Sequence, residues 1–328
     1  MRTLVTGGAG FIGAHVVDLL RQRGDDVVIV DDLVTGLAER VPGIVIHEMD
    51  IADTASVAPL TELLRAERID SVIHFAARKQ VFESMQRPAW YVQQNLGSLA
   101  NLLLAMEGAG VRRLVFSSSA SVYGTTEGEA IVESDPTVPV NPYGETKLVG
   151  EHLVAAAGAA WGLRGVSLRY FNVAGAASSL LGDRAVLNLV PMVFERLDAG
   201  ESPLVFGGDY PTPDGSCVRD YVHVSDLADA HLATLDDLEQ RADGWHDVYN
   251  VGTGTGTSVL EIARIVREVT GIEIAPELRP RRAGDPAIVV ASAAKIEREL
   301  GWRARRDITE IIASAWNAHR ANSGEHAV

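Results

Sequence analysis

The sequence has little of the material from which disulfide frameworks, metal cages and membrane spans are built. Its 328 residues include a single cysteine, Cys217, which excludes an intrachain disulfide and a thiolate metal cage. The nine histidines follow no spacing typical of metal ligands, so we expect no bound metal. No apolar run approaches the roughly 20 residues that a spanning helix needs, and we expect no membrane segment.

Positive charge is also scarce. The chain carries 29 lysines and arginines against 44 acidic residues, a formal net charge of -15. This balance disfavours binding to nucleic acid or to an anionic membrane, and an anionic ligand would need a local cluster of arginines. The N-terminus is interrupted by glycines and does not look like a secretory signal. We therefore expect a cytoplasmic protein.

Glycine, in contrast, is concentrated near the N-terminus. Gly8, Gly10 and Gly13 form a G-x-G-x-x-G pattern between the apolar stretch Arg2–Thr6 and a helical pattern. Asp31 ends the next apolar run, 18 positions after Gly13. Strand, glycine loop, helix and acidic residue together predict a dinucleotide site with the pyrophosphate at the helix N-terminus. Asp31 would accept hydrogen bonds from the adenosine ribose and repel a 2'-phosphate, which favours NAD over NADP.

The first half of the chain alternates between strand and helix patterns. Strands are predicted near residues 27–30, 45–46, 71–73, 114–116 and 165–169, and helices near 56–65, 89–106 and from 143 onward. This order predicts an α/β fold with a doubly wound parallel Rossmann sheet. Ligands of such sheets bind at the carboxyl ends of the strands, where Asp50, Phe75 and Ser117 lie.

Beyond Gly175 the loops lengthen, which predicts a domain boundary. We assign residues 1–175 to an NAD-binding domain and residues 176–328 to a smaller C-terminal α/β domain for the substrate, with 219–250 packing back on the first. Helices are predicted near residues 186–199, 293–300 and 308–320, and another is opened by residues 219–226. Ser225 or Asp226 is suited to cap that helix, and His223 before it is interpreted as a structural histidine.

Tyr143 and Lys147 lie four residues apart, so they share one face of a helix. A cationic amine beside a phenol favours the phenolate, which predicts a lowered pKa and a general base. The same spacing also occurs on exposed amphipathic helices. The nearby glycine loop, with Ser119 at the end of a strand, favours catalysis.

Several segments resemble the UDP-glucose 4-epimerase family within the extended short-chain dehydrogenase/reductase superfamily. They are the glycine loop from Thr6 to Gly13, Ser119 to Gly124, the Tyr143–Lys147 pair, and the stretches 75–79, 169–172, 209–223 and 282–285. The resemblance covers nearly the whole chain. It implies that Tyr143 takes the proton of the sugar 4-hydroxyl while NAD accepts the C4 hydride, with Lys147 and Ser119 assisting.

The resemblance also implies two sets of binding residues. The cofactor set is Gly7, Gly10, Phe11, Ile12, Gly13, Asp31, Asp32, Asp50, Ile51, Phe75, Ala76, Ala77, Lys79, Asn95, Ser117, Tyr143, Lys147 and Tyr170. The UDP-sugar set is Ser119, Tyr143, Asn172, Asn188, Leu189, Phe206, Arg219, Arg282 and Asp285. Within the second set, the guanidinium groups of Arg219 and Arg282 suit the diphosphate because they pair bidentately with its oxygens.

The rival functions are other nucleotide-sugar enzymes of the superfamily and a non-catalytic NAD sensor. A 4,6-dehydratase typically carries an acidic residue beside Ser119, where this chain has Ala120. A sensor can lose the catalytic residues, which this chain keeps. The aliphatic residue Val289, at the position that borders the sugar in the family, favours a pocket that also admits N-acetylated sugars.

The resemblance further implies a homodimer. In the family the helices that here begin near Ala89 and Tyr143 pair across a two-fold axis. Their apolar residues Leu99, Leu102, Leu103, Val149 and Leu153 suit an interface or a core equally well.

Overall fold

A parallel seven-stranded sheet forms the centre of the computed structural model, which describes residues 1–125, 130–282 and 285–324. Its strand order is β10-β6-β5-β4-β1-β2-β3. The strands are β1 (Arg2–Thr6), β2 (Asp26–Asp31), β3 (Ile46–Glu48), β4 (Ser71–His74), β5 (Arg113–Ser119), β6 (Arg164–Tyr170) and β10 (His246–Val251). The order reverses between β1 and β4, and ligands of doubly wound sheets bind at such a point.

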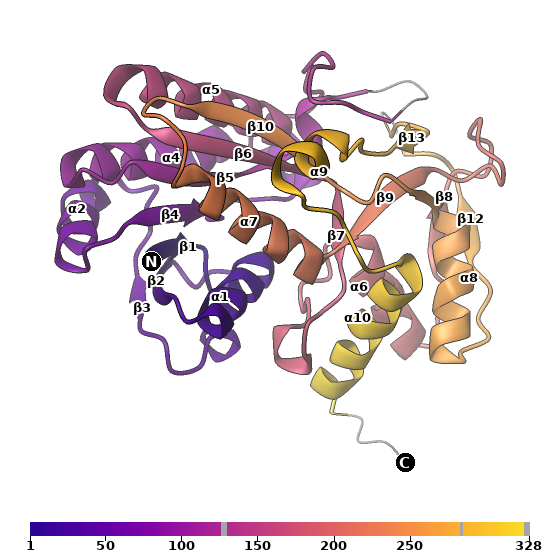
Figure 1. Cartoon of the computed structure of the whole chain (residues 1–328). Coiled ribbons are helices and arrows are strands. Elements are labelled where there is room, and N and C mark those ends of the chain that lie inside the picture. The colour runs from indigo at the N-terminus through magenta and orange to yellow at the C-terminus, as the bar shows by residue number, and fades with distance from the viewer. Residues whose placement is uncertain (126–129, 283–284, 325–328) are drawn as a thin grey trace.

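Both faces of this sheet are covered, which explains the unbroken apolar runs of its strands. Leu4 packs among α2 (Val57–Ala66), α4 (Pro88–Ala109) and α5 (Pro142–Trp161), whereas its neighbour Val5 packs among α1 (Phe11–Arg23) and α7 (Val224–Leu238). Figure 1 shows these two helical layers on opposite sides of the sheet. Alternation along each strand therefore feeds two separate apolar cores.

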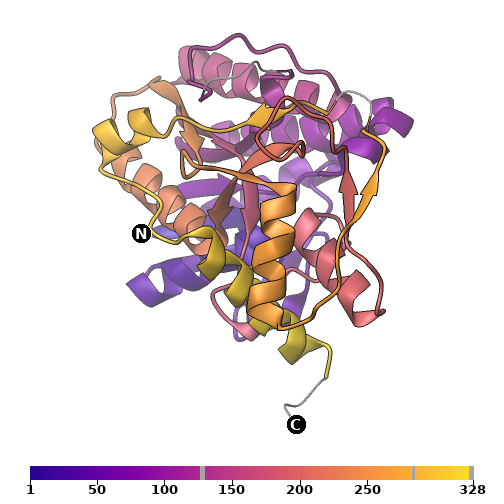
Figure 2. The same cartoon turned by 90° about the vertical axis from the view of Figure 1, so that its right-hand side faces the viewer.

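The C-terminal part builds smaller sheets beside the large one. Strand β9 (Val218–His223) pairs with β7 (Asn172–Ala174), β11 (Gly256–Ser258) and β13 (Ile288–Val289), while β8 (Leu204–Phe206) pairs with β12 (Glu277–Arg279). Three helices, α6 (Leu189–Asp198), α8 (Val259–Thr270) and α10 (Ile308–Asn322), pack around Phe194, Ile265 and Trp316. Helix α10 contacts both α8 and α6, and Figure 2 shows the three helices at one end of the molecule.

The α/β prediction is confirmed, and the observed elements lie close to the predicted ranges. The elements that were not predicted are β10, α8, the short α3 (Val81–Gln86) and the strands of the smaller sheets, β7, β8, β9, β11, β12 and β13. The last helices are α9 (Ala294–Leu300) and α10. The predicted cap of α7 is wrong: His223, not Ser225 or Asp226, is its N-cap, since the His223 Nδ1 accepts the Ser225 N–H at 3.0 Å.

Residues 219–250 contribute to both regions. Strand β9 belongs to the smaller sheet, whereas α7 contacts α1 and β10 is the edge strand of the large sheet beside β6. Across the described residues, no helix combines the length and the apolar character needed to cross a membrane.

Candidate active site

The glycine loop between β1 and α1 packs so closely against neighbouring backbone that it has no space for side chains at key positions. Gly7 has φ +71°, and a Cβ there would lie 2.8 Å from the Ala76 backbone nitrogen. A Cβ at Gly13 would lie 2.2 Å from the Gly7 oxygen, so only glycine lets α1 start this close to the loop. Gly10 is the N-cap of α1, and no side chain caps this end. The first N–H groups of the helix are thus available to an anion.

The carboxylate of Asp31 lies at the end of β2 beside this loop. It accepts the Ala9 N–H at 2.9 Å and the Leu33 N–H at 2.9 Å, one with each oxygen. Burial raises the pKa of Asp31, and these two N–H groups lower it. Lone pairs remain on both oxygens for the hydroxyl groups of a ribose.

A cavity of about 410 Å³ opens along the loop and the strand ends. Every residue of the predicted cofactor set lines it except Asn95. The buried Asn95 side chain instead holds the backbone of Arg78, accepting its N–H at 2.8 Å and donating to its oxygen at 3.0 Å. Its place is therefore behind the wall of the cavity.

Helix α5 brings Tyr143 and Lys147 to this cavity because of how the helix begins. Asn141 is extended and caps the helix, its side chain accepting the Gly144 N–H at 2.8 Å, and Pro142 occupies the first turn. A Cβ on Gly144 would lie 2.5 Å from the Ser121 oxygen. The first turn of α5 therefore packs directly against the backbone that follows β5, where Ser119 lies.

Tyr143, Ser119 and Lys147 form one connected group. The Ser119 side chain hydrogen-bonds the Tyr143 hydroxyl. The buried Lys147 amine donates to the Ser117 oxygen at 2.7 Å and lies 5.8 Å from the centre of the Tyr143 ring. Tyr143 and Lys147 both line the cavity, as expected for two residues on one helix face.

The predicted lowering of the Tyr143 pKa by Lys147 is not found in the protein chain alone. Burial raises the pKa of Tyr143, and the hydrogen bond from Ser119 is what lowers it. Burial also lowers the pKa of Lys147 to about 7, against a smaller raising effect of Glu151. A lysine with a lowered pKa carries less positive charge near neutral pH with which to stabilise a phenolate.

Of the predicted sugar-nucleotide residues, Tyr143 is the one found among the described lining of the cavity. Others lie together in the smaller sheets. Arg219 on β9 pairs with Asp285 at 2.6 Å, and the Arg282 guanidinium lies 3.9 Å from the centre of the Phe206 ring. The two residues between Arg282 and Asp285 lie outside the described residues.

The remaining members of that set are placed near these groups or beside the cavity. Asn172 begins β7 and its side chain hydrogen-bonds Tyr221. The Asn188 side chain donates to Asp183 at 3.1 Å, and Leu189 begins α6. Asp183 and Leu187 do line the cavity, so this segment reaches it through neighbours of the predicted residues.

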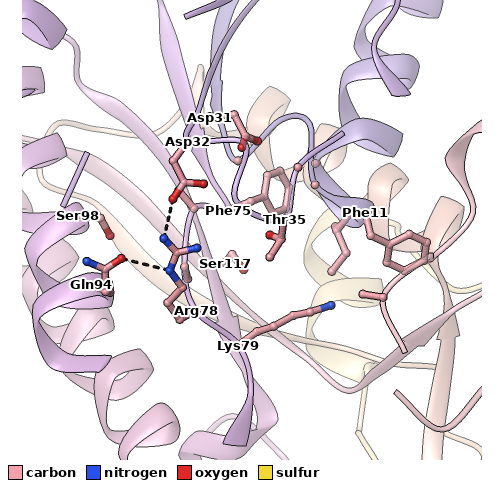
Figure 3. Close-up of a pocket in the computed structure, with 18 of the residues that line it drawn as sticks. Phe11, Asp31, Asp32, Thr35, Phe75, Arg78, Lys79, Gln94, Ser98 and Ser117 are labelled. Carbon is pink, nitrogen blue, oxygen red and sulfur yellow. Dashed lines mark hydrogen bonds and ion pairs between the residues drawn. The ribbon is translucent and has the colours of Figure 1, made fainter. Parts of the chain in front are cut away.

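Sequence reasoning missed several lining residues, of which Arg78 makes the most contacts. Its guanidinium pairs with Asp32 at 2.6 Å and donates to Gln94 at 3.2 Å, as Figure 3 shows. Gln94 and Thr35 also line the cavity. Arg78 stood next to the predicted Lys79, and its place directly after a strand end was the available signal. Arg40 was missed too; it is buried and donates to the Gly182 oxygen at 2.8 Å.

These features fit NAD. The glycine loop and the uncapped N-terminus of α1 suit the pyrophosphate, and Asp31 suits the adenosine ribose. Tyr143 and Lys147 line the same cavity. The features that suit the cofactor and the predicted catalytic residues Tyr143 and Lys147 therefore share one cavity.

The comparisons with known proteins agree with this geometry. The family model described as the NAD dependent epimerase/dehydratase family matches residues 3–252. The UDP-glucose 4-epimerase of Lacticaseibacillus casei is 43% identical over 325 residues, 97% of each chain. That of Streptomyces lividans is 44% identical over 323 residues, covering 97% of this chain and 96% of the relative.

Solved structures give the same result. A UDP-glucose 4-epimerase from Stenotrophomonas maltophila, crystallised with NAD and formylated UDP-arabinopyranose, is 41% identical with a TM-score of 0.94, over 98% of this chain and 99% of that one. The glycine loop, the Tyr143–Lys147 helix and these near full-length matches place the chain in the NAD dependent epimerase/dehydratase family, in its UDP-glucose 4-epimerase branch.

Proposed function

We propose that this protein interconverts UDP-glucose and UDP-galactose by reversible epimerisation at C4, with NAD as a retained cofactor. The observation that carries the proposal is that a dinucleotide-binding site and a pair of residues suited to proton transfer lie at one cavity. The glycine loop with Asp31 suits a dinucleotide, and the hydrogen-bonded Tyr143 and Ser119 lie where the sugar can meet it. Relatives of similar length with this activity support it.

Tyr143, Ser119 and Lys147 are proposed to have separate roles in the reaction. Tyr143 takes the proton of the 4-hydroxyl and later returns it, so it must act as a reversible base. Ser119 hydrogen-bonds the Tyr143 hydroxyl and can pass this proton to or from the sugar oxygen. Lys147, anchored on the Ser117 oxygen, holds the ribose side of the site. When bound, oxidised NAD supplies a positively charged hydride acceptor for C4 of the sugar.

The residues that bind the UDP part of the substrate are proposed to lie in and beside the smaller sheets, within residues 176–328. Arg219 and Arg282 would hold the diphosphate, with Asp285 on the uridine ribose and Phe206 against the base. Support comes from their placement, since the pairs Arg219–Asp285 and Arg282–Phe206 already order these side chains. A firm hold on the diphosphate leaves the hexose free to turn and present its other face.

The test is the addition of UDP-galactose to purified protein carrying its own NAD. We expect UDP-glucose to form, with a transient absorbance of reduced nicotinamide and no net release of NADH. A non-catalytic sensor would bind NAD and leave every UDP-sugar unchanged. Formation of a stable 4-keto product would instead indicate a dehydratase.

The sugar pocket is proposed to admit N-acetylated hexoses as well. Val289 on β13 lies in register with Arg219 on β9, so a short aliphatic side chain neighbours the proposed diphosphate ligand. We expect measurable kcat/KM for UDP-N-acetylgalactosamine, and a selective loss of it in Val289→Tyr. UDP-galactose turnover by the same variant is the internal control, and undetectable N-acetyl turnover by the wild type would reject the idea.

A homodimer through α4 and α5 is also proposed. Leu99, Leu102 and Leu103 are buried in the core of the single chain, so the proposed interface is assigned to other residues. Val92 and Leu104 on α4 are 46% and 55% exposed, and Val149 on α5 is 38% exposed. These apolar side chains support an interface there. The cytoplasmic location stays a prediction.

A further inference from the structure

The ion pair between Asp32 and Arg78 crosses the sheet edge at which the dinucleotide is expected to bind. Asp32 follows β2, and Arg78 lies in the loop after β4. Because β1 lies between these two strands in the sheet, the pair passes across the carboxyl end of β1, where the glycine loop begins. Both side chains line the cavity. The pair therefore links two walls of the cavity.

Each partner is held by further contacts. Asp32 accepts the Val34 N–H at 3.1 Å with the oxygen that does not face Arg78. The Arg78 Nε donates to Gln94 on α4 at 3.2 Å. The Arg78 backbone is fixed on both sides by the Asn95 amide. The two loops are thus anchored separately, and the side-chain ion pair joins them.

Asn95, which holds the backbone of Arg78, also contacts helix α5, which carries Tyr143 and Lys147. Asn95 donates to the Thr146 hydroxyl at 3.0 Å, and that hydroxyl donates to the backbone carbonyl oxygen of Tyr143 at 2.7 Å. Lys79, the next residue, directs its amine toward Phe11, away from Arg78, as Figure 3 shows. The side chains of Arg78 and Lys79 therefore point toward opposite ends of the cavity, and Arg78 lies at the end near Asp32.

We propose that the Asp32–Arg78 ion pair closes over the adenosine half of bound NAD and sets the rate at which the cofactor leaves. The inference rests on the proposed function, because it takes the cavity as the NAD site. With Asp31 on the ribose, the adenosine lies at the end of the cavity where the pair joins the two loops. Opening the pair separates these loops without disturbing their backbone anchors.

The partial exposure of this ion pair suits a contact that can break and form again. Its side chains are 18% and 26% exposed, so solvent and salt reach the contact, yet it is shielded more than a surface ion pair. Breaking such a contact raises a dissociation rate more than it changes an association rate. Salt should therefore speed NAD release from the wild type.

The experiment follows radiolabelled NAD leaving the loaded protein during a chase with unlabelled NAD. We expect Arg78→Met and Asp32→Asn each to release NAD about tenfold faster than the wild type, the scale of losing one partly shielded charge pair. The double variant should release it no faster than the faster single variant. Salt should speed release from the wild type and have little further effect in Arg78→Met.

Arg113→Met is the matched control. Arg113 pairs with Glu239 at 3.0 Å with side chains 25% and 49% exposed, at the start of β5 and away from the cavity lining. This variant should release NAD at the wild-type rate.

Three results would overturn the proposal: release from Arg78→Met within twofold of the wild type, effects that multiply in the double variant, or release from the wild type that is insensitive to salt. Multiplying effects would mean that each residue contacts NAD independently. A wild type that epimerises UDP-galactose but shows any of these results rejects the ion-pair role alone. A wild type that neither retains NAD nor epimerises rejects the proposed function with it.

Discussion

Tyr143 is the proposed general base, and its surroundings favour the protonated phenol. Burial raises its pKa, while the Ser119 hydrogen bond works in the opposite direction. The neighbouring Lys147 is itself buried and has a pKa lowered to about 7. In the proposed reaction, bound oxidised NAD would add positive charge that favours the phenolate, and Tyr143 would then act as the base.

Replacing Tyr143 with Phe removes the hydroxyl and leaves the ring in place. We expect kcat for UDP-galactose to fall by about 10²–10⁴-fold, the usual contribution of a positioned general base. NAD content and melting temperature should stay near the wild-type values because the ring still packs between α5 and the cavity. Turnover close to that of the wild type would show that another group takes the proton.

Residue identities were predictable from the sequence where a motif fixes the backbone, and much less so where two loops meet. The lining residues Gly7, Gly13 and Asp31 follow from the strand–loop–helix pattern. Arg78 was not found because its partner Asp32 lies 46 residues away in the chain and only the sheet order brings them together. The pKa of Tyr143 depends on burial, which local spacing does not reveal.

At the scale of elements, α5 is held against the sheet by a buried ion pair. Arg169 on β6 contacts Glu151 on α5 through two hydrogen bonds of 2.9 and 2.6 Å, and also donates to the Tyr123 hydroxyl at 2.8 Å. The two charged side chains are 6% and 3% exposed. Glu151 lies one helical turn beyond Lys147, so the pair fixes the helix that carries the catalytic residues.

Arg169→Met would leave the Glu151 carboxylate buried without its positive partner. We expect a loss of about 3–5 kcal/mol of stability, seen as a melting temperature lower by roughly 10 °C. The double variant Arg169→Met/Glu151→Leu should recover most of this loss, because the buried carboxylate is removed together with its guanidinium partner. Equal melting temperatures for the wild type and Arg169→Met would contradict a structural role for the pair.

Element prediction from the sequence succeeded where the apolar periodicity is strong and failed in the C-terminal half. Helix α5 was recognisable from Asn141-Pro142 and the residues after it. Strand β10 was not predicted, because joining the large sheet beside β6 depends on a long-range pairing that no local pattern records. The His223 cap of α7 was missed because Ser and Asp are the commoner N-cap residues.

For the whole molecule, the α/β architecture was predictable because alternating strands and helices leave few ways to bury both faces of a sheet. How the C-terminal segments divide between the large sheet and the smaller ones was not. Within residues 219–250, β9 belongs to a smaller sheet, α7 packs on the large sheet, and β10 is a strand of the large sheet. The two regions are therefore tied together by one continuous segment, and disturbing either should affect the other.

Acid should destabilise the molecule through its buried histidines. Burial lowers the pKa of His15 to about 4, of His74 to about 3, and of His223 and His231 to about 4, against 6.5 for a free side chain. Hydrogen bonds hold the neutral rings in place; His15 accepts the Ala177 N–H at 3.1 Å and bonds the Phe11 oxygen at 2.8 Å. These rings join the glycine-loop helix, the large sheet and the C-terminal region.

Between pH 6.5 and about 4 the unfolded chain binds protons at these histidines that the folded protein does not, so stability falls as the pH is lowered through this window. Removing one such group should flatten the slope. We expect the wild type to lose about 2 kcal/mol more unfolding free energy than His15→Asn between pH 7 and pH 5, measured by urea titration at each pH. His152→Asn, on the exposed surface of α5, is the control and should follow the wild type. If His15→Asn also follows the wild type, the acid sensitivity lies in the carboxylates and not in this buried ring.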